Sequence, residues 1–394
     1  MTEPLADPLW RNATDLCCDL QRGTIAATTL MENVYARIAA LNPRLNALVD
    51  LMPQEQAMAL AATADAVPIA ERGPLHGLPM APKDAVAVKG FSTSWGYRGF
   101  SENVEAQDDE LARRLREAGA IFIGHSNMPE FGLGSHTFNQ LYGHTYNPWD
   151  LSKTPGGSSG GAAVALAADM LPLADGSDLG GSLRNPASFC NVVGFRPSIG
   201  RMPFSRGFGW YGRMVTTGPM AKNIRDTILL FSVMAGPHGS DPLTLADPGT
   251  TFLDALEPLE SSDLGRLRIG FSKDLGGLPI DPEVTEITAT AAATMERMGA
   301  TVVESAPDLK DAMEVFQVQR AAGLRLLAKR LENIDPNWRD TIKETARWNI
   351  EKGLALTADE LMNAELKRSA LYSRVAQYFD CLLYTSDAAD DLYR

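Results

Sequence analysis

The chain of 394 residues has a composition typical of a globular protein, with 45% hydrophobic and 22% charged residues. A chain of this kind can bury a large core. Its formal net charge of −13 argues against nucleic-acid binding as the main function, because an acidic surface repels phosphate backbones. An RNA-linked role through a partner protein stays open.

The cysteines, histidines and apolar segments argue against further classes of protein. Cys17, Cys18, Cys190 and Cys381 have the spacing of neither a zinc site nor a disulfide framework, so we expect reduced thiols and a cytoplasmic protein. The start of the chain lacks a signal-peptide pattern, and no apolar run reaches the roughly 18 residues of a membrane helix. The five histidines are scattered, so we expect neither a metal nor another cofactor.

The first part of the chain combines amphipathic helices with short apolar segments. Apolar residues recur at helical spacing over residues 24–41, which predicts a helix ended by Asn42-Pro43. A second helix is predicted over residues 109–118, with Gly119 as its C-terminal cap. That helix leads directly into an apolar segment, residues 120–123, which we interpret as a strand.

A similar order recurs later in the chain. Residues 267–271 are predicted to form a strand, residues 282–298 a helix and residues 301–303 a second strand. Helices that lead into strands through a single glycine indicate an α/β fold with crossover connections. Residues 311–379 have a helical pattern that is broken near Asp335-Pro336.

Three segments contain the residue types that amide hydrolysis needs: residues 77–84, 154–161 and 175–184. Such a reaction requires an activated hydroxyl, a base for its proton and donors for the tetrahedral oxyanion. Glycines before Ser182 allow successive N–H groups to converge beside its hydroxyl. Ser158, in another glycine-rich turn, can relay a proton.

Lys83 is flanked by apolar residues. Desolvation there would lower the pKa of Lys83, so that this lysine could act as a neutral base. Taken singly, Lys83, Ser158 and Ser182 would each be interpreted as ordinary surface or loop residues. Their order and spacing together favour a catalytic site.

These segments resemble the signature of the amidase-signature hydrolases. The resemblance includes Pro-Gly-Gly-Ser-Ser-Gly-Gly at 155–161, Gly-Ser-Asp-Leu-Gly-Gly-Ser-Leu-Arg-Asn-Pro-Ala at 176–187, and the upstream segment that ends at Lys83-Asp84. It is close over residues 22–245 and loose elsewhere. It implies an α/β amidase-signature fold with a central mixed β-sheet covered by helices on both faces. It also implies a single domain over residues 1–380, with a catalytic core at 73–245.

The resemblance implies catalytic roles for three side chains. Ser182 would be the nucleophile, and Ser158, on a cis peptide bond, would shuttle protons between Ser182 and Lys83. The backbone N–H groups of four residues would form the oxyanion hole: Leu179, Gly180, Gly181 and Ser182. Asp178 and Arg184 would pair to hold that loop, and Gly157 and Ser159 would shape the turn around Ser158.

The implied activity is hydrolysis of a carboxamide, at a C–N bond other than a peptide bond, through an acyl-serine intermediate. The products would be a carboxylate and ammonia or an amine. The expected partner is a small-molecule amide, without nucleic acid or membrane, and the expected oligomeric state is a homodimer. Phe131, Phe138, Trp210 and Tyr211 could favour aryl or medium-length acyl groups, although ordinary core packing is favoured for them.

Three alternatives compete with this interpretation. A Gly-x-Ser-x-Gly elbow at Ser158 or Ser159 is rejected, because it would need an apolar strand just before it. The A-type component of glutamyl-tRNA amidotransferase, which works as a glutaminase within a complex, shares the signature. However, the segment Asn191–Ser198 and the insert Phe208–Tyr211 are unlike that component. A non-enzymatic binding protein would be expected to lose Ser182 or Lys83.

The end of the chain departs from the family pattern. Phe379-Asp380 resembles the start of a family strand, whereas the sequence from Cys381 to Asp390 is similar to the translation of a sequencing adaptor. We therefore interpret residues 381–394 as a non-native read-through tail and expect the natural gene to continue. The C-terminal part of the domain would then be incomplete.

Overall fold

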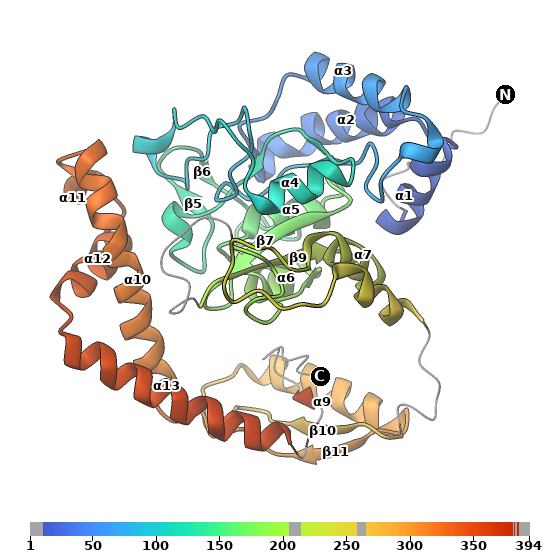
Figure 1. Ribbon diagram of the computed structural model, residues 1–394. Helices are drawn as coiled ribbons and strands as arrows, with labels where there is room; N and C mark the ends of the chain where they lie inside the picture. Colours follow the sequence, from blue (N-terminus) through green and yellow to red (C-terminus); the bar gives the residue numbers. More distant parts are fainter. Residues whose placement is uncertain (1–10, 205–213, 258–264, 381, 383, 386–394) are drawn as a thin grey trace. The chain divides into compact units, whose positions relative to one another are not determined.

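The computed structural model describes residues 11–204, 214–257, 265–380, 382 and 384–385 (Figure 1). Their contacts divide the chain into two compact units. The first contains residues up to 256 together with 334–346, and the second contains 257–333 and the residues from 347 onward. A single amidase-signature domain over residues 1–380 stays a prediction. Most of the adaptor-like segment, and the insert with Trp210 and Tyr211, lie outside the described residues.

The first unit begins with helices and short strands. Its elements up to Ser158 are α1 (Ala13–Arg22), α2 (Ala27–Leu45), β1 (Leu48–Val49), α3 (Gln54–Asp65), β2 (Pro79–Met80), α4 (Glu110–Glu117), β3 (Ile121–Phe122), β4 (His125–Ser126), β5 (Phe138–Asn139) and β6 (Gly143–His144). After Ser158 come α5 (Gly160–Ala167), β7 (Ala174–Asp178), α6 (Arg184–Cys190), β8 (Val193–Gly194), β9 (Thr216–Ala221) and α7 (Ile224–Met234). Short 3₁₀ helices lie at Ile69–Glu71, Arg98–Phe100, Glu130–Gly132 and Gly249–Leu256, and α11 (Trp338–Thr341) lies in the segment 334–346.

Helix α2 continues beyond the predicted stop at Asn42-Pro43, and Pro43 lies inside its last turn. Proline removes one helical hydrogen bond, which usually ends a helix. Beyond the helix, Oδ1 of Asn42 accepts from the backbone N–H of Ala47 at 2.9 Å. The helix ends at Asn46, whose left-handed backbone (φ 49°) terminates it instead.

The predicted crossover around α4 is confirmed. Strands β2 and β3 pair in parallel, with α4 between them in sequence. Asp109 caps α4 by accepting from the N–H of Ala112 at 2.9 Å. Gly119 follows α4 with φ 99°, and a Cβ there would lie 2.7 Å from the Cα of His76. Only glycine fits this turn, so the sequence signal and the structure agree.

Strand β7 lies beside β9 (Figure 1). These two strands and β8 form an antiparallel sheet in the order β7-β9-β8. The two glycine-rich segments meet beside it, since one leads into α5 and the other follows β7. Lys83 belongs to a different ladder, because it forms a parallel bridge with Ser126 shortly after the paired strands β2 and β3. Lys83 and the two glycine-rich segments are thus held by different strand ladders of the first unit.

The predicted mixed α/β class is confirmed. The described strands are short: β2 has 2 residues and β9 has 6. Their hydrogen bonds therefore form several small sheets, both parallel and antiparallel, in place of one long ladder among the described residues. The core of the first unit consists mainly of aliphatic residues from α1, α2 and α5 and from the segments around Lys83.

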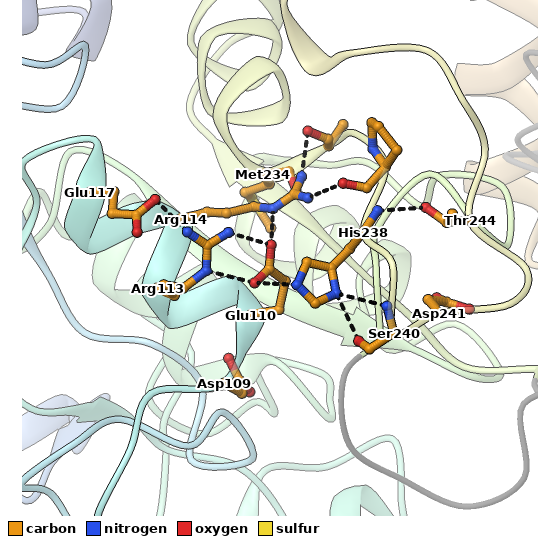
Figure 2. A network of polar contacts seen from close by, with 12 residues as sticks. Asp109, Glu110, Arg113, Arg114, Glu117, Met234, His238, Ser240, Asp241 and Thr244 are labelled. Carbon is orange, nitrogen blue, oxygen red and sulfur yellow. Dashed lines mark hydrogen bonds and ion pairs between the residues drawn. The ribbon is translucent and has the colours of Figure 1, made fainter.

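A polar network joins α4 to the end of α7 (Figure 2). Glu110, with a side chain 4% exposed, pairs with Arg114 at 2.6 Å and with His238 at 3.3 Å. Arg114 Nη1 in turn donates to the carbonyl of Ala235 at 2.7 Å, which satisfies a free carbonyl at the helix end. This network fixes α4, whose cap Asp109 accepts from the N–H of Ala87, close to Lys83, at 3.2 Å.

The second unit contains another crossover and a set of long helices. Strands β10 (Arg268–Phe271) and β11 (Thr301–Glu304) pair in parallel around α9 (Pro282–Arg297), as predicted. The remaining elements are α10 (Ala312–Ile334), α12 (Glu344–Ala355), α13 (Ala358–Phe379) and β12 (Tyr384–Thr385). The predicted helical break is confirmed, because α10 ends at Ile334. No helix in the described ranges is long and apolar enough to cross a membrane.

Candidate active site

The side chain of Lys83 lies at the centre of a buried cluster of hydroxyl groups. Lys83 is 1% exposed, and its Nζ lies 2.7 Å from Ser158 Oγ, 2.8 Å from Ser159 Oγ and 3.0 Å from Ser177 Oγ. An ammonium group would donate to all three hydroxyls. A neutral amine would donate to two and accept from the third, so the arrangement suits either protonation state.

Burial lowers the pKa of Lys83 to about 7, from an ordinary value of 10.5, against the opposing effects of Asp175 and Asp178. The cause is the loss of hydration that the charged form needs. A lysine with this pKa is neutral in a large fraction of molecules near pH 7. The sequence-based expectation of a desolvated lysine is therefore supported by its surroundings.

Ser158 follows a cis peptide bond to Gly157, as the resemblance implied. A Cβ at Gly157 would lie 3.0 Å from the carbonyl oxygen of Gly134, so a side chain there would require the backbone opposite to move. Ser159 does more than shape this turn. Its hydroxyl contacts Lys83 directly, and its N–H donates to the carbonyl of Ser182 at 3.2 Å.

Strand β7 contributes two residues that the sequence interpretation did not select. Asp175 and Ser177 are two positions apart, so they lie on the same face of the strand. Both carboxylate oxygens of Asp175 lie 3.3 Å from the backbone nitrogen of Lys83, and Ser177 Oγ contacts its Nζ. The sequence contains this spacing of Asp175 and Ser177. It would have indicated a shared face only if the small residues around them had been recognised as a strand.

Ser182 lies in the turn between β7 and α6 and is partly exposed. No described residue forms a hydrogen bond with its Oγ. The structure thus brings Lys83 and Ser158 into direct contact, whereas it joins Ser182 to the cluster through the backbone bond from Ser159. A partly exposed serine in this turn is accessible to a substrate from solvent.

Asp178 holds the Ser182 turn from inside the protein. Its carboxylate is 0% exposed and pairs with Arg184 at 3.1 Å and with Arg196 at 3.6 Å. Although burial alone would raise it, the pKa of Asp178 stays below its usual value because of Arg184 and two backbone N–H groups. The pairing of Asp178 with Arg184 was predicted, and the contribution of Arg196 was not.

The predicted oxyanion hole stays a prediction, and one of its four donors already has an acceptor. The N–H of Gly181 donates to Oδ1 of Asp178 at 2.7 Å, so this donor is engaged by the carboxylate. Asp178 attracts it because a buried carboxylate needs hydrogen bonds. The N–H groups of Leu179, Gly180 and Ser182 have no acceptor among the described residues, and they remain the candidate donors.

Glu130 and Lys343 lie beside the same region, although the sequence interpretation assigned neither a role. The N–H of Lys343 donates to Glu130 Oε1 at 2.6 Å, and Lys343 Nζ donates to the carbonyl of Leu133 at 3.1 Å. The neighbouring Gly132 is close to the hydroxyl cluster, since a Cβ there would lie 3.5 Å from Ser158 Oγ. The segment 334–346 therefore supports the loop that adjoins Ser158.

Comparison with known proteins places the chain in a family. A family model described as Amidase matches residues 29–387, and the chain belongs to that family. The chain is 36% identical over 299 residues to an acylamidase of Rhodococcus erythropolis, which covers 76% of this chain and 62% of that protein. It is 35% identical over 310 residues to the A component of the glutamyl-tRNA(Gln) amidotransferase of Methylococcus capsulatus, which covers 78% of this chain and 63% of that protein.

Solved structures agree with the family assignment. A structure of 6-aminohexanoate cyclic dimer hydrolase complexed with substrate matches with a TM-score of 0.85 and 25% identity, covering 95% of this chain and 78% of that chain. The chain spans less than two thirds of the length of both curated relatives described above.

Proposed function

We propose that the protein is a serine amidase that hydrolyses a small carboxamide to a carboxylate and ammonia or an amine. Ser182 is the nucleophile, Ser158 the proton relay and Lys83 the base. One observation supports this proposal above all: the Nζ of a fully buried lysine lies 2.7 Å from Ser158 Oγ, beside the turn that presents Ser182. The acylamidase relative supports the same reaction class.

The proposed reaction begins with a proton transfer. Neutral Lys83 accepts a proton from the Ser158 hydroxyl, which in turn takes the proton of Ser182 as Ser182 Oγ bonds to the substrate carbonyl carbon. The N–H groups of Leu179, Gly180 and Ser182 stabilise the oxyanion, which forms only in the transition state and the intermediate. The hydroxyl of Ser182 therefore does not have to ionise before it attacks the carbonyl carbon.

Collapse of the intermediate breaks the C–N bond. The proton held by Lys83 returns through Ser158 to the leaving nitrogen, and this leaves an ester on Ser182 and a neutral amine or ammonia. Water then attacks the ester with the same base, and the carboxylate departs. Lys83 is neutral again after the ester has formed and after it has been hydrolysed, so it can act as the base in each following half-reaction.

The test is intact-mass labelling with a fluorophosphonate probe on the unmodified chain, Ser182→Ala and Ser188→Ala. Ser188 is an exposed serine of the neighbouring helix and serves as the matched control. We expect one adduct on the unmodified chain and on Ser188→Ala, and none on Ser182→Ala. An adduct that survives in Ser182→Ala would assign the nucleophile elsewhere and overturn the proposal.

The amidotransferase relative defines the competing function, a glutaminase that acts within a complex. A panel of carboxamides that includes glutamine separates the two. Turnover of simple amides by the isolated chain supports the amidase. Hydrolysis limited to glutamine, or labelling without any amide turnover, favours the amidotransferase component.

Location and assembly follow from the same proposal. We propose a cytoplasmic enzyme, consistent with the unpaired thiols of Cys17, Cys18 and Cys190, since such thiols persist in reducing compartments. We also propose a homodimer. Light scattering of the purified chain tests the dimer, and a monomer mass at working concentration would exclude it.

A further inference from the structure

Asp175 is a fully buried carboxylate beside the proposed base. Its exposure is 0%, and both of its oxygens lie 3.3 Å from the backbone nitrogen of Lys83. These are long hydrogen bonds that share a single N–H. A buried carboxylate normally has several strong partners, so Asp175 is poorly compensated for the loss of water.

The contrast with Asp178, three residues later, shows what full compensation requires. Asp178 is equally buried but accepts from the N–H groups of Gly181 and Leu183 and pairs with Arg184. Asp175 has no arginine partner among the described residues. The cation that acts on its carboxylate is Lys83, and the carboxylate of Asp109 acts on it in the opposite sense, by repulsion.

The face of β7 lies along the Lys83 residue. Asp175 contacts its backbone nitrogen, and Ser177, two positions further, contacts its Nζ at 3.0 Å. The strand thus holds both ends of the lysine. A carboxylate in this place can fix the lysine backbone and also change how strongly the amine holds its proton.

We propose that Asp175 is a positioning residue that sets the protonation of Lys83, so that the two groups share one proton in the resting site. This inference rests on the proposed amidase function and adds a residue to it. Burial raises the pKa of Asp175 to about 7, against the opposing effects of the Lys83 hydrogen bond and charge. Burial likewise lowers the pKa of Lys83 to about 7.

The shared proton has a chemical consequence. When it lies on the Asp175 carboxyl, Lys83 is neutral and ready to act as a base. When it lies on Lys83, the amine is charged and cannot accept the proton of Ser182. The titratable groups that face the pair are Asp178, which favours the charged lysine, and Asp109, which favours the protonated carboxyl of Asp175.

The experiment measures the pH dependence of fluorophosphonate labelling of Ser182 in the unmodified chain, Asp175→Asn and Asp175→Glu. Loss of the charge removes an interaction that favours protonated Lys83. We therefore expect the pH midpoint of Ser182 labelling in Asp175→Asn to move by roughly one pH unit or more toward acid. Asp175→Glu keeps the charge and should retain a midpoint near that of the unmodified chain.

Asp226→Asn is the matched control. Asp226 is another 0% exposed carboxylate, but it accepts from the N–H groups of Ala13 and Thr14 at the start of α1. We expect it to lower stability without moving the labelling midpoint. An unmoved midpoint in folded Asp175→Asn, with a uniform loss of rate at all pH values, would reduce Asp175 to a structural role and overturn the inference.

A second measurement on the unmodified chain covers the case in which Asp175→Asn does not fold. The band to be measured is an infrared band of a protonated carboxyl that disappears over the same pH range as labelling appears. It is assigned to Asp175 if it stays in Glu130→Gln, which removes the other buried carboxyl with a pKa of about 7, and shifts in Asp175→Glu. Such a band supports the shared proton, and its absence contradicts it. Absence of all Ser182 labelling in the unmodified chain is a separate result. It would count against the amidase proposal itself.

Discussion

The N–H of Gly181 donates to Oδ1 of Asp178 at 2.7 Å, and this bond holds the turn that precedes Ser182. Asp178→Ala would remove the acceptor of that bond and the buried carboxylate with which Arg184 and Arg196 pair. We expect a loss of roughly 3–5 kcal/mol in the free energy of unfolding, because breaking a buried ion pair leaves an uncompensated charge.

Chemical denaturation followed by circular dichroism measures this loss. Asp247→Ala is the control, since Asp247 pairs with Arg201 but is 54% exposed, and exposed pairs contribute about 0–1 kcal/mol. Equal effects of the two substitutions would show that the Asp178 cluster does not hold the turn.

The second prediction concerns the pH dependence of the unmodified chain. Because burial lowers the pKa of Lys83 to about 7, the neutral fraction of the base increases with pH and is half complete near pH 7. We expect the rate of probe labelling at Ser182 to rise with the same midpoint and to level off above it. A midpoint near 10.5, the ordinary value for lysine, would show that Lys83 is hydrated.

Lys83→Arg provides the matched variant for this prediction. Arginine keeps a positive charge throughout the accessible pH range and cannot act as a base. We expect the labelling rate to fall by roughly 10²–10⁴, the usual contribution of a positioned general base. Retention of the full rate would show that another group accepts the proton of Ser182.

The residues of the site differ in how far the sequence alone could predict them. Lys83, Ser158 and Ser182 were predicted from the order and spacing of their motifs and from the family resemblance of these motifs, since none of the three residues gives a sufficient signal alone. Asp175 and Ser177 were missed because β7 is made of small and polar residues, which give no strand signal. The contact between Glu130 and Lys343 joins residues 213 positions apart, and no local pattern reports such a pair.

The fold shows the same division between local and distant interactions. The crossovers around α4 and α9 were predictable, because helix periodicity and a terminal glycine act within a few residues. The true end of α2 was not, since proline usually ends a helix, whereas Pro43 lies inside the last turn of α2. The membership of residues 334–346 in the first unit depends on tertiary packing, including the fully buried Trp338.

The third prediction concerns Gly181, which has a φ of 109°. A Cβ at this position would lie 2.8 Å from Asn185 Nδ2, and the backbone conformation itself is one that other residues rarely adopt. We expect Gly181→Ala to cost roughly 1–3 kcal/mol in stability and to slow labelling of Ser182, because the turn must shift.

Gly239→Ala is the control for Gly181. A Cβ at Gly239 would meet nothing within 4 Å, so we expect labelling and the unfolding midpoint to stay unchanged. The comparison uses the same two measurements on both variants. Wild-type labelling of Gly181→Ala would mean that the turn tolerates a side chain and that its geometry is less restricted than the structure indicates.

The last prediction concerns Glu130, which is 1% exposed. Burial raises its pKa from 4.5 to about 7, against the opposing hydrogen bond and charge of Lys343. Between these two values the folded chain retains a proton that the unfolded chain releases. The contribution of Glu130 to stability therefore falls as pH rises through this window, and its full cost is present above about pH 7.

Glu130→Gln removes the charge and keeps an oxygen that can accept from the N–H of Lys343. We expect the unfolding temperature of this variant, relative to the unmodified chain, to increase as the pH is raised from about 5 to about 8.5. Glu55→Gln, at an exposed position of α3, should show no such trend. If the difference for Glu130→Gln is the same at both pH values, the carboxyl is ionised throughout, and Lys343 compensates its burial fully.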